Sequence, residues 1–252
     1  MKGLQRRRLV LAGLALTVWT AGGYAAVIMT QHPLVGVVMG VLLTITLSSL
    51  WEWLVHGYMY HGRGLPGMKT VMQIHVAGHH HGLFPPTRYV QDGPYPFMRF
   101  RRPHRPWQMS DNALDNALTK LSQVGLHFLV GLPFIVLPAW WFTHDPVFTA
   151  STLITAMVIS WLLAHVHGCI HTPRGRWIEH QRWFQWLDRH HYIHHIDHQA
   201  NINFLLPVCD ALFGTLKTEL TPKEAARWPT FEEAKPMALD IPHHARQQRP
   251  VS

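Results

Sequence analysis

Charged residues are scarce in this chain of 252 residues. They make up 14% of it, whereas a soluble domain carries roughly 25%. Hydrophobic residues reach 48%, so the composition argues against an ordinary soluble domain. Cysteine is equally scarce. Cys169 and Cys209 are too few for a disulfide-rich scaffold, and they form no CxxC pair of the kind that binds zinc.

Lysine and arginine are absent from two short segments that join long apolar runs. The runs are roughly 9–29, 33–55, 124–142 and 147–165. Each is close to the ~20 residues that a helix needs to cross a bilayer. The links are residues 30–32 and 143–146, and all 22 Lys and Arg lie outside them. The sequence therefore predicts an all-α integral membrane protein with four transmembrane helices in two hairpins.

The same charge distribution predicts an orientation. Basic residues collect on the cytoplasmic side of membrane proteins, so both termini and the segment between the hairpins are expected in the cytoplasm. Basic residues beside membrane spans meet anionic headgroups. The net charge of +8 is explained in this way without a nucleic-acid partner.

The N-terminus admits a second interpretation. An Arg-rich start, an apolar run and small residues at Ala25 and Ala26 also resemble a secretory signal peptide. The run is long for such a peptide and a second apolar run follows at once, which favours an uncleaved span. We expect residues 1–220 to form the membrane domain and residues 221–252 to form a polar C-terminal tail.

Histidine, by contrast, is abundant and clustered. The chain has 21, and ten of them fall into four groups on the inferred cytoplasmic side. They are His56 and His61; His75, His79 and His80; His167 and His171; and His191, His194 and His195. Neutral imidazole is a favoured ligand for iron, copper, nickel and zinc. Ten such ligands are too many for one ion and suit two, so the sequence predicts a two-metal centre.

Helical spacing explains two of the groups directly. His167 and His171 are four residues apart, which places both rings on one helix face. His191, His194 and His195 have the spacing i, i+3, i+4 and also share a face. One helix can therefore direct each group toward a single metal region.

The other two groups are less regular. His56 and His61 are five apart, which separates their rings on an ideal α-helix. This pair requires a helix end between the two residues or two different approaches to the site. In the second group, His80 needs local unwinding at Gly78 to turn inward, and His81 is the alternative ligand.

Polar residues near the groups are candidates for outer hydrogen bonds. A metal-bound histidine usually passes its other ring N–H to a carboxylate or a carbonyl. The candidates are Glu52, Asp188, Asp197, Asn203, Asp210, His165, His190 and His198. Glu52 stands out because a carboxylate at the end of a span is costly without a reason. The other acids are explained equally well as surface acids or helix caps, and Asn203 as a turn residue.

Four histidine motifs together resemble the membrane fatty acid hydroxylase/sterol desaturase superfamily. They are HGYMYH (56–61), HVAGHH (75–80), HVHGCIH (165–171) and HHYIHH (190–195). The stretch NINFLLPVCDALFGT (201–215) is similar to the family's closing stretch, so the resemblance covers most of 51–215.

Within the superfamily, the fatty acid 2-hydroxylases are the most similar, through Trp51-Glu52-Trp53 and Pro85-Pro86. The chain departs from their pattern in two places. Three residues rather than two separate His75 from His79, and Cys209 stands where that family has a tryptophan.

The resemblance implies a non-haem di-iron oxygenase with a helical cytoplasmic cap that holds the metal site. Its cofactors would be two Fe ions, with O2 as co-substrate, and its reaction the hydroxylation of a fatty-acyl chain or lipid. Zinc can occupy such a site in purified protein, because the affinity order favours zinc over ferrous iron. The sequence has no flavin or nicotinamide fingerprint and no fused haem domain. The electrons are therefore expected from a separate ferredoxin- or cytochrome-like partner.

Two alternatives remain beside hydroxylation. A desaturase or a sterol- or carotenoid-modifying oxygenase of the same superfamily would use the same metal centre. A non-catalytic membrane metal-binding or transport protein is the other alternative. A transporter would need ionisable residues in mid-span, and the apolar runs hold almost none.

Overall fold

The computed structural model describes residues 2–61, 75, 80, 131–171, 176–228 and 231. Every regular element in these residues is helical, which confirms the all-α prediction for this part of the chain. The chain forms two compact units. Unit 1 comprises Met1–Trp53, Ala113–Val166 and Leu205–Leu216; unit 2 comprises Leu54–Asn112, His167–Phe204 and Lys217–Ser252.

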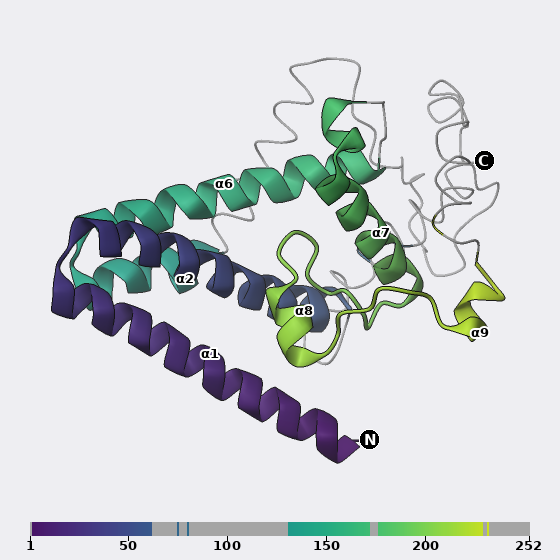
Figure 1. Cartoon of the computed structure of the whole chain (residues 1–252), viewed down its shortest axis with the longest axis horizontal. Helices are drawn as coiled ribbons and strands as arrows, with labels where there is room; N and C mark the ends of the chain where they lie inside the picture. The colour runs from purple at the N-terminus through teal and green to yellow at the C-terminus, as the bar shows by residue number, and fades with distance from the viewer. Residues whose placement is uncertain are drawn as a thin grey trace, which may run out of the picture. The chain divides into compact units, whose positions relative to one another are not determined.

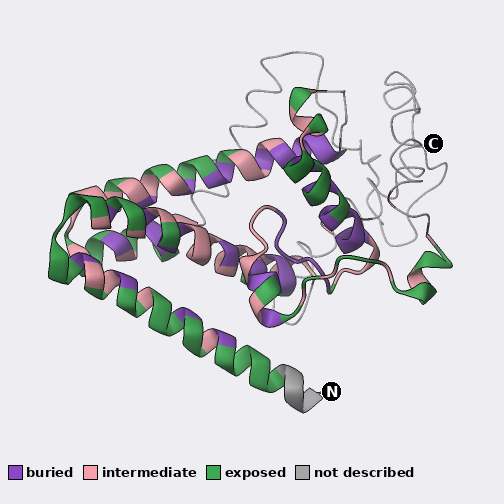
Figure 2. Cartoon of the chain, in the orientation of Figure 1, coloured by how far each residue is buried: buried purple, intermediate pink, exposed green. Residues whose placement is uncertain are grey.

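Three helices are long and apolar enough to cross a membrane. They are α1 (Lys2–Thr30), α2 (Pro33–Leu54) and α6 (Pro146–His171) (Figure 1). The last residues of α6, from His167 on, belong to unit 2. Figure 2 shows many exposed residues along these helices in green, and they include large apolar ones such as Leu11, Val18 and Ile154. Exposed apolar surface on this scale is typical of a membrane-facing or partner-facing surface.

The fourth predicted span lies partly outside the described residues. Its described part is the apolar helix Gly131–Thr143, which alone is too short to count as a span. The structure therefore supports three of the four predicted spans, and the fourth stays a prediction.

Both links between neighbouring long helices begin with a residue in the left-handed region. Gln31 and His144 have φ values of 50° and 49° and terminate the helices before them. In the second link, Asp145 Oδ1 accepts the backbone N–H groups of Val147 and Phe148 at 2.8 and 2.9 Å. This is the bonding of an N-cap residue, so the link ends one helix and starts α6 within two residues.

The core of unit 1 contains side chains from the helices that precede and follow each of the two links. Val27, Leu43, Ala139 and Phe148 form one buried cluster. The ring of Tyr24 packs edge-on against that of Phe148, with centroids 5.5 Å apart. Residues from α1, α2, the helix Gly131–Thr143 and α6 thus share one core.

Close helix packing requires Gly40 on α2. A Cβ atom at this position would lie 2.7 Å from Ser151 Cβ and 3.1 Å from the Phe148 carbonyl oxygen, both on α6. Ser151 Oγ also donates to the Val37 carbonyl at 2.9 Å. Small residues that allow such an approach are typical of helix contacts in membranes.

The segment after the last histidine motif returns to unit 1 as α8 (Val208–Phe213). Arg8 on α1 donates to the carbonyls of Ala211 and Leu212 at 2.7 and 3.0 Å. On α2, the buried Ser49 Oγ accepts the Cys209 N–H at 3.0 Å. These bonds attach α8 to both N-terminal helices.

Unit 2 carries the histidines. Its described elements are the π-helix η1 (Val55–Tyr60), the 3₁₀ helix η4 (Trp177–His180), α7 (Arg182–Ile196) and α9 (Pro222–Ala225). On α7 the buried face includes Phe184 and Leu187 together with its histidines, whereas Trp183 and Trp186 are exposed.

Candidate metal centre

Five histidines from three separate segments of unit 2 converge on one point. They are His56, His61, His75, His80 and His194, each offering one ring nitrogen, and these nitrogens all lie within 4.8 Å of one another. Nε2 of His75 is 3.1 Å from that of His56 and 3.0 Å from that of His80. Nε2 of His61 is 3.2 Å from that of His194.

These separations can be compared with those around one ion. With metal–nitrogen bonds of about 2.1 Å, adjacent octahedral ligands lie roughly 3 Å apart and opposite ones roughly 4.2 Å. The short separations match adjacent ligands, and the limit of 4.8 Å within which all five nitrogens lie is somewhat above the value for opposite ligands. The arrangement therefore fits the ligands of one ion.

Hydrogen bonds on the far side of two rings determine which nitrogens face the centre. His56 Nδ1 donates to the Ile202 carbonyl at 2.6 Å, and His194 Nδ1 donates to the Ala200 carbonyl at 2.8 Å. A neutral imidazole has a single N–H. The Nε2 atoms of His56 and His194 must therefore direct lone pairs at the other rings.

Without a metal ion, His75 Nε2 cannot form good hydrogen bonds to both of its ring-nitrogen neighbours. Its Nε2 lies within hydrogen-bond distance of Nε2 of both His56 and His80, and it has either a proton or a lone pair. Since His56 offers a lone pair, a proton on His75 Nε2 could point at only one of the two neighbouring nitrogens, and without that proton the His56 and His75 lone pairs would face each other. A cation among the rings removes this conflict, because every Nε2 atom can then be a ligand.

Burial keeps the rings in the form that binds metals. His80 and His194 are 2% and 0% exposed. Burial, and next the neighbouring imidazoles, lower the pKa of His75 and His194 well below the ordinary histidine value. His75 and His194 are therefore neutral at neutral pH, as metal ligation requires.

A π turn explains the spacing of five residues between His56 and His61. The His61 N–H donates to the His56 carbonyl at 3.2 Å, which is the i→i+5 bond of a π-helix. The centroids of the two rings lie 5.0 Å apart, and the ring planes are inclined by 28°. The π-helix ends at Tyr60. This agrees with the expectation of a helix end between His56 and His61. His75 and His80, also five apart, both have π-helical backbone.

Three further predicted ligands form a smaller set beside the five. Nε2 atoms of His191 and His195 are 2.9 Å apart. The ring of His167 lies 4.9 Å from that of His191, and the ring of His195 lies 4.3 Å from that of His80. The side chain of His171, and the whole of His79 and His81, lie outside the described residues. The second metal ion therefore stays a prediction.

Several predicted outer residues have contacts that the structure defines. The backbone carbonyl of Asn203 accepts His190 Nε2–H at 2.7 Å. His198 Nε2 donates to the His195 carbonyl at 3.2 Å. Asp197 Oδ2 accepts the ammonium of Lys217 at 2.8 Å.

Four further candidates, two of them with a defined contact, also lie within the described residues. In unit 1, the buried Asp210 accepts the hydroxyl of Thr215 at 2.5 Å. His165 stacks on Trp161, also in unit 1, with ring centroids 5.1 Å apart. Glu52, at the end of α2, is half-buried, and Asp188 is buried on α7 in unit 2.

The carbonyls of Ala200 and Ile202 did not emerge from the sequence. Both accept ring N–H groups of histidines in the group of five. Every residue has a carbonyl, so no residue type distinguishes these positions. Only the path of the chain shows which carbonyls reach a ring.

Comparisons with protein-family models, curated proteins and solved structures give no match to this chain. The superfamily resemblance therefore stays a prediction from the histidine motifs. The chemical interpretation rests on the arrangement of the described side chains.

Proposed function

We propose that this protein is a membrane-bound non-haem di-iron oxygenase that hydroxylates a fatty-acyl chain or lipid. The observation that carries the proposal is the convergence of five histidines from three separate segments. In the overall reaction, the substrate C–H bond, O2, two electrons and two protons give an alcohol and water. The electrons come from a separate ferredoxin- or cytochrome-like donor.

The ligand set favours iron as the working metal. Structural zinc sites usually have four ligands and often include thiolates, whereas this group has five imidazoles and includes neither Cys169 nor Cys209. Five imidazoles would leave room for a co-substrate on an ion that takes six ligands. Bound iron supplies the redox chemistry that an unactivated C–H bond requires, and zinc is redox-silent.

Chain continuity supports a substrate from the membrane. α2 passes directly into η1 with His56, and the candidate span of α6 continues through His167. Histidines thus follow immediately upon two apolar helices, where an acyl chain in the bilayer is close by. We propose further that the helices form four spans, with a helical cap, both termini and the metal site on the cytoplasmic side.

The residues of the site have defined tasks in this reaction. The five imidazoles bind the ion, and the Ala200 and Ile202 carbonyls orient two of them. The burial of His80 and His194 limits access of water, which protects a reactive site from side reactions.

The test combines metal content with lipid analysis. Protein purified from iron-supplemented cells is analysed for metals by mass spectrometry, and lipids of expressing and non-expressing cells are compared. We expect iron in the wild type and lipids with one added oxygen atom. His194→Ala should lose both, whereas His32→Gln, which replaces an exposed histidine of unit 1, should keep both.

Each outcome has a clear meaning. An oxidised product that persists in His194→Ala contradicts the assigned site. A wild type that binds iron but changes no lipid indicates a non-catalytic metal-binding protein. A product with a new double bond in place of an added oxygen indicates the desaturase alternative.

A further inference from the structure

One short segment supplies carbonyl groups to three buried histidines, His56, His190 and His194. We call residues 197–204 the carbonyl loop. Within it, the Ala200 carbonyl accepts His194 Nδ1–H at 2.8 Å and the Ile202 carbonyl accepts His56 Nδ1–H at 2.6 Å. Two rings that face the same centre are thus oriented by carbonyls on either side of a single residue, Asn201.

Asn201 has a backbone conformation that few residues adopt. Its φ is +52°, in the left-handed region where asparagine is tolerated better than most side chains. This conformation turns the chain between the Ala200 and Ile202 carbonyls. The two carbonyls can therefore reach rings from different helices, His194 on α7 and His56 on η1.

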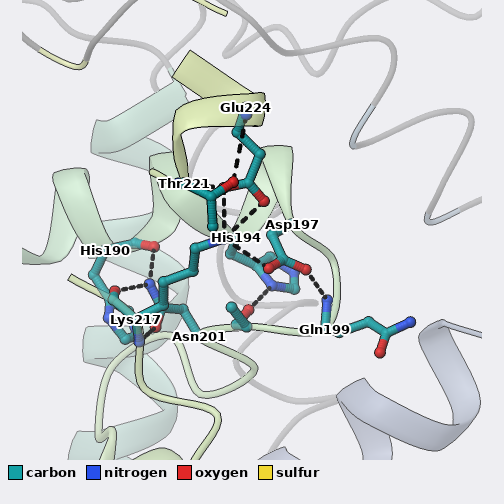
Figure 3. A network of polar contacts seen from close by, with 9 residues as sticks. His190, His194, Asp197, Gln199, Asn201, Lys217, Thr221 and Glu224 are labelled. Carbon is teal, nitrogen blue, oxygen red and sulfur yellow. Dashed lines mark hydrogen bonds and ion pairs between the residues drawn. The ribbon is translucent and has the colours of Figure 1, made fainter. Parts of the chain in front are cut away.

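The side chain of Asn201 holds this conformation in place. It is 1% exposed, and its amide nitrogen donates to the carbonyls of His190 and Lys217 at 3.0 and 2.8 Å. Its oxygen accepts the Lys217 N–H at 2.7 Å. Figure 3 shows Asn201 between His190 and Lys217, with these contacts dashed. The amide joins His190 on α7 to Lys217 in the segment after the loop.

An ion pair also holds the first residue of the carbonyl loop. The Lys217 ammonium binds Asp197 at 2.8 Å and Glu224 at 2.7 Å. Since Asp197 begins the carbonyl loop and Lys217 also pairs with Asn201, the loop is attached at its start and at its middle. Its carbonyls are therefore held before any ion arrives.

We propose that Asn201 is a positioning residue for the metal centre. By fixing the carbonyl loop, it holds His56 and His194 in the Nδ1–H tautomer, with unprotonated Nε2 atoms directed at the ion. The proposal rests on the metal binding of the proposed function and not on its oxygenase reaction. Removing partners that orient metal-bound histidines typically lowers metal affinity about 10–100-fold.

The experiment uses the full chain in lipid nanodiscs. Histidine-selective ¹⁵N NMR of metal-free protein reports the tautomer of each ring, and competition with a chelator gives the affinity for Fe(II). Three variants are compared with the wild type. Asn201→Gly removes the amide yet tolerates positive φ, Asn201→Asp keeps the oxygen acceptor but lacks the donor, and Gln199→Ala changes an exposed side chain of the same loop.

We expect the wild type to show His56 and His194 as Nδ1–H tautomers without metal. Asn201→Gly should mix the tautomers and bind the same number of ions about 10–100-fold more weakly, and Gln199→Ala should match the wild type. Wild-type affinity and tautomers in Asn201→Gly would overturn the proposal, as would Nε2–H tautomers in the wild type. If Asn201→Gly does not fold, Asn201→Asp is judged by the same criteria.

The two proposals can fail separately. A wild type with the expected tautomers that binds no Fe(II) overturns both the metal function and the role of Asn201 in it. A wild type that binds Fe(II) while Asn201→Gly equals it overturns only the positioning role.

Discussion

Replacing Lys217 with methionine tests how the carbonyl loop is held. The ammonium contacts Asp197 Oδ2 at 2.8 Å and both carboxylate oxygens of Glu224 at 2.7 Å. Methionine keeps most of the length and apolar stem of lysine but removes the charge and its donors. The Asn201 amide bonds to the backbone of Lys217, and these bonds do not depend on the Lys217 side chain. The variant therefore removes the ion pairs alone.

The magnitude follows from burial. The side chains of Lys217, Asp197 and Glu224 are 18%, 30% and 22% exposed. Fully exposed ion pairs contribute about 0–1 kcal/mol, and hydrogen bonds to charged groups about 1.5–3 kcal/mol. For two pairs in this intermediate environment, with solvent screening, we expect Lys217→Met to lower the free energy of unfolding by about 2 kcal/mol.

The loss should depend on pH in a defined direction. Burial opposes the charge on both partners. Even so, bonds to Asp197 and Glu224 raise the pKa of Lys217, and the bond from Lys217 lowers the pKa of Glu224. The Glu224 contribution is complete above its ordinary pKa of 4.5 and is lost as pH falls through the lower folded value. The Lys217 contribution is complete below 10.5 and is lost as pH rises through the higher folded value.

The assay is unfolding of the wild type and Lys217→Met in one detergent across this pH range. The difference between them should be largest between pH 4.5 and 10.5 and should shrink at either extreme. A double-mutant cycle with Glu224→Gln isolates the pair. A loss below about 0.5 kcal/mol at neutral pH, or no coupling to Glu224, would refute the reasoning.

Two further predictions concern the helices of unit 1, and thermal unfolding in the same detergent checks both. Gly40→Ala places a Cβ atom 2.7 Å from atoms of α6 and should cost about 1–3 kcal/mol; Gly22→Ala, with nothing within 4 Å, should be neutral or slightly stabilising. Ser49→Ala removes the acceptor of the Cys209 N–H and should cost about 1–3 kcal/mol, whereas Ser48→Ala should stay within about 0.5 kcal/mol. Equal stability of Gly40→Ala and Gly22→Ala would show that α2 and α6 are not tightly packed, and equal losses at Ser48 and Ser49 would remove the special role of Ser49.

Much of the helical scaffold could be predicted from the length and position of the apolar runs in the sequence. The apolar runs 9–29, 33–55 and 147–165 correspond to α1, α2 and α6, because the length and hydropathy of a span are local properties of the chain. The short polar links between the runs mark the turns for the same reason. The run 124–142 is described only in part.

The sequence also predicted histidine as the residue type of the candidate site, since histidines clustered near span ends are visible without coordinates. The convergence of His56, His75 and His194 required the tertiary structure, because these residues are distant in sequence and their distances depend on how the segments pack. The π turn at His56–His61 arises from hydrogen bonding that α-helical periodicity does not describe. The carbonyls of Ala200 and Ile202 reach histidine rings only because the chain turns at Asn201, and backbone groups, which every residue shares, leave no mark in a sequence.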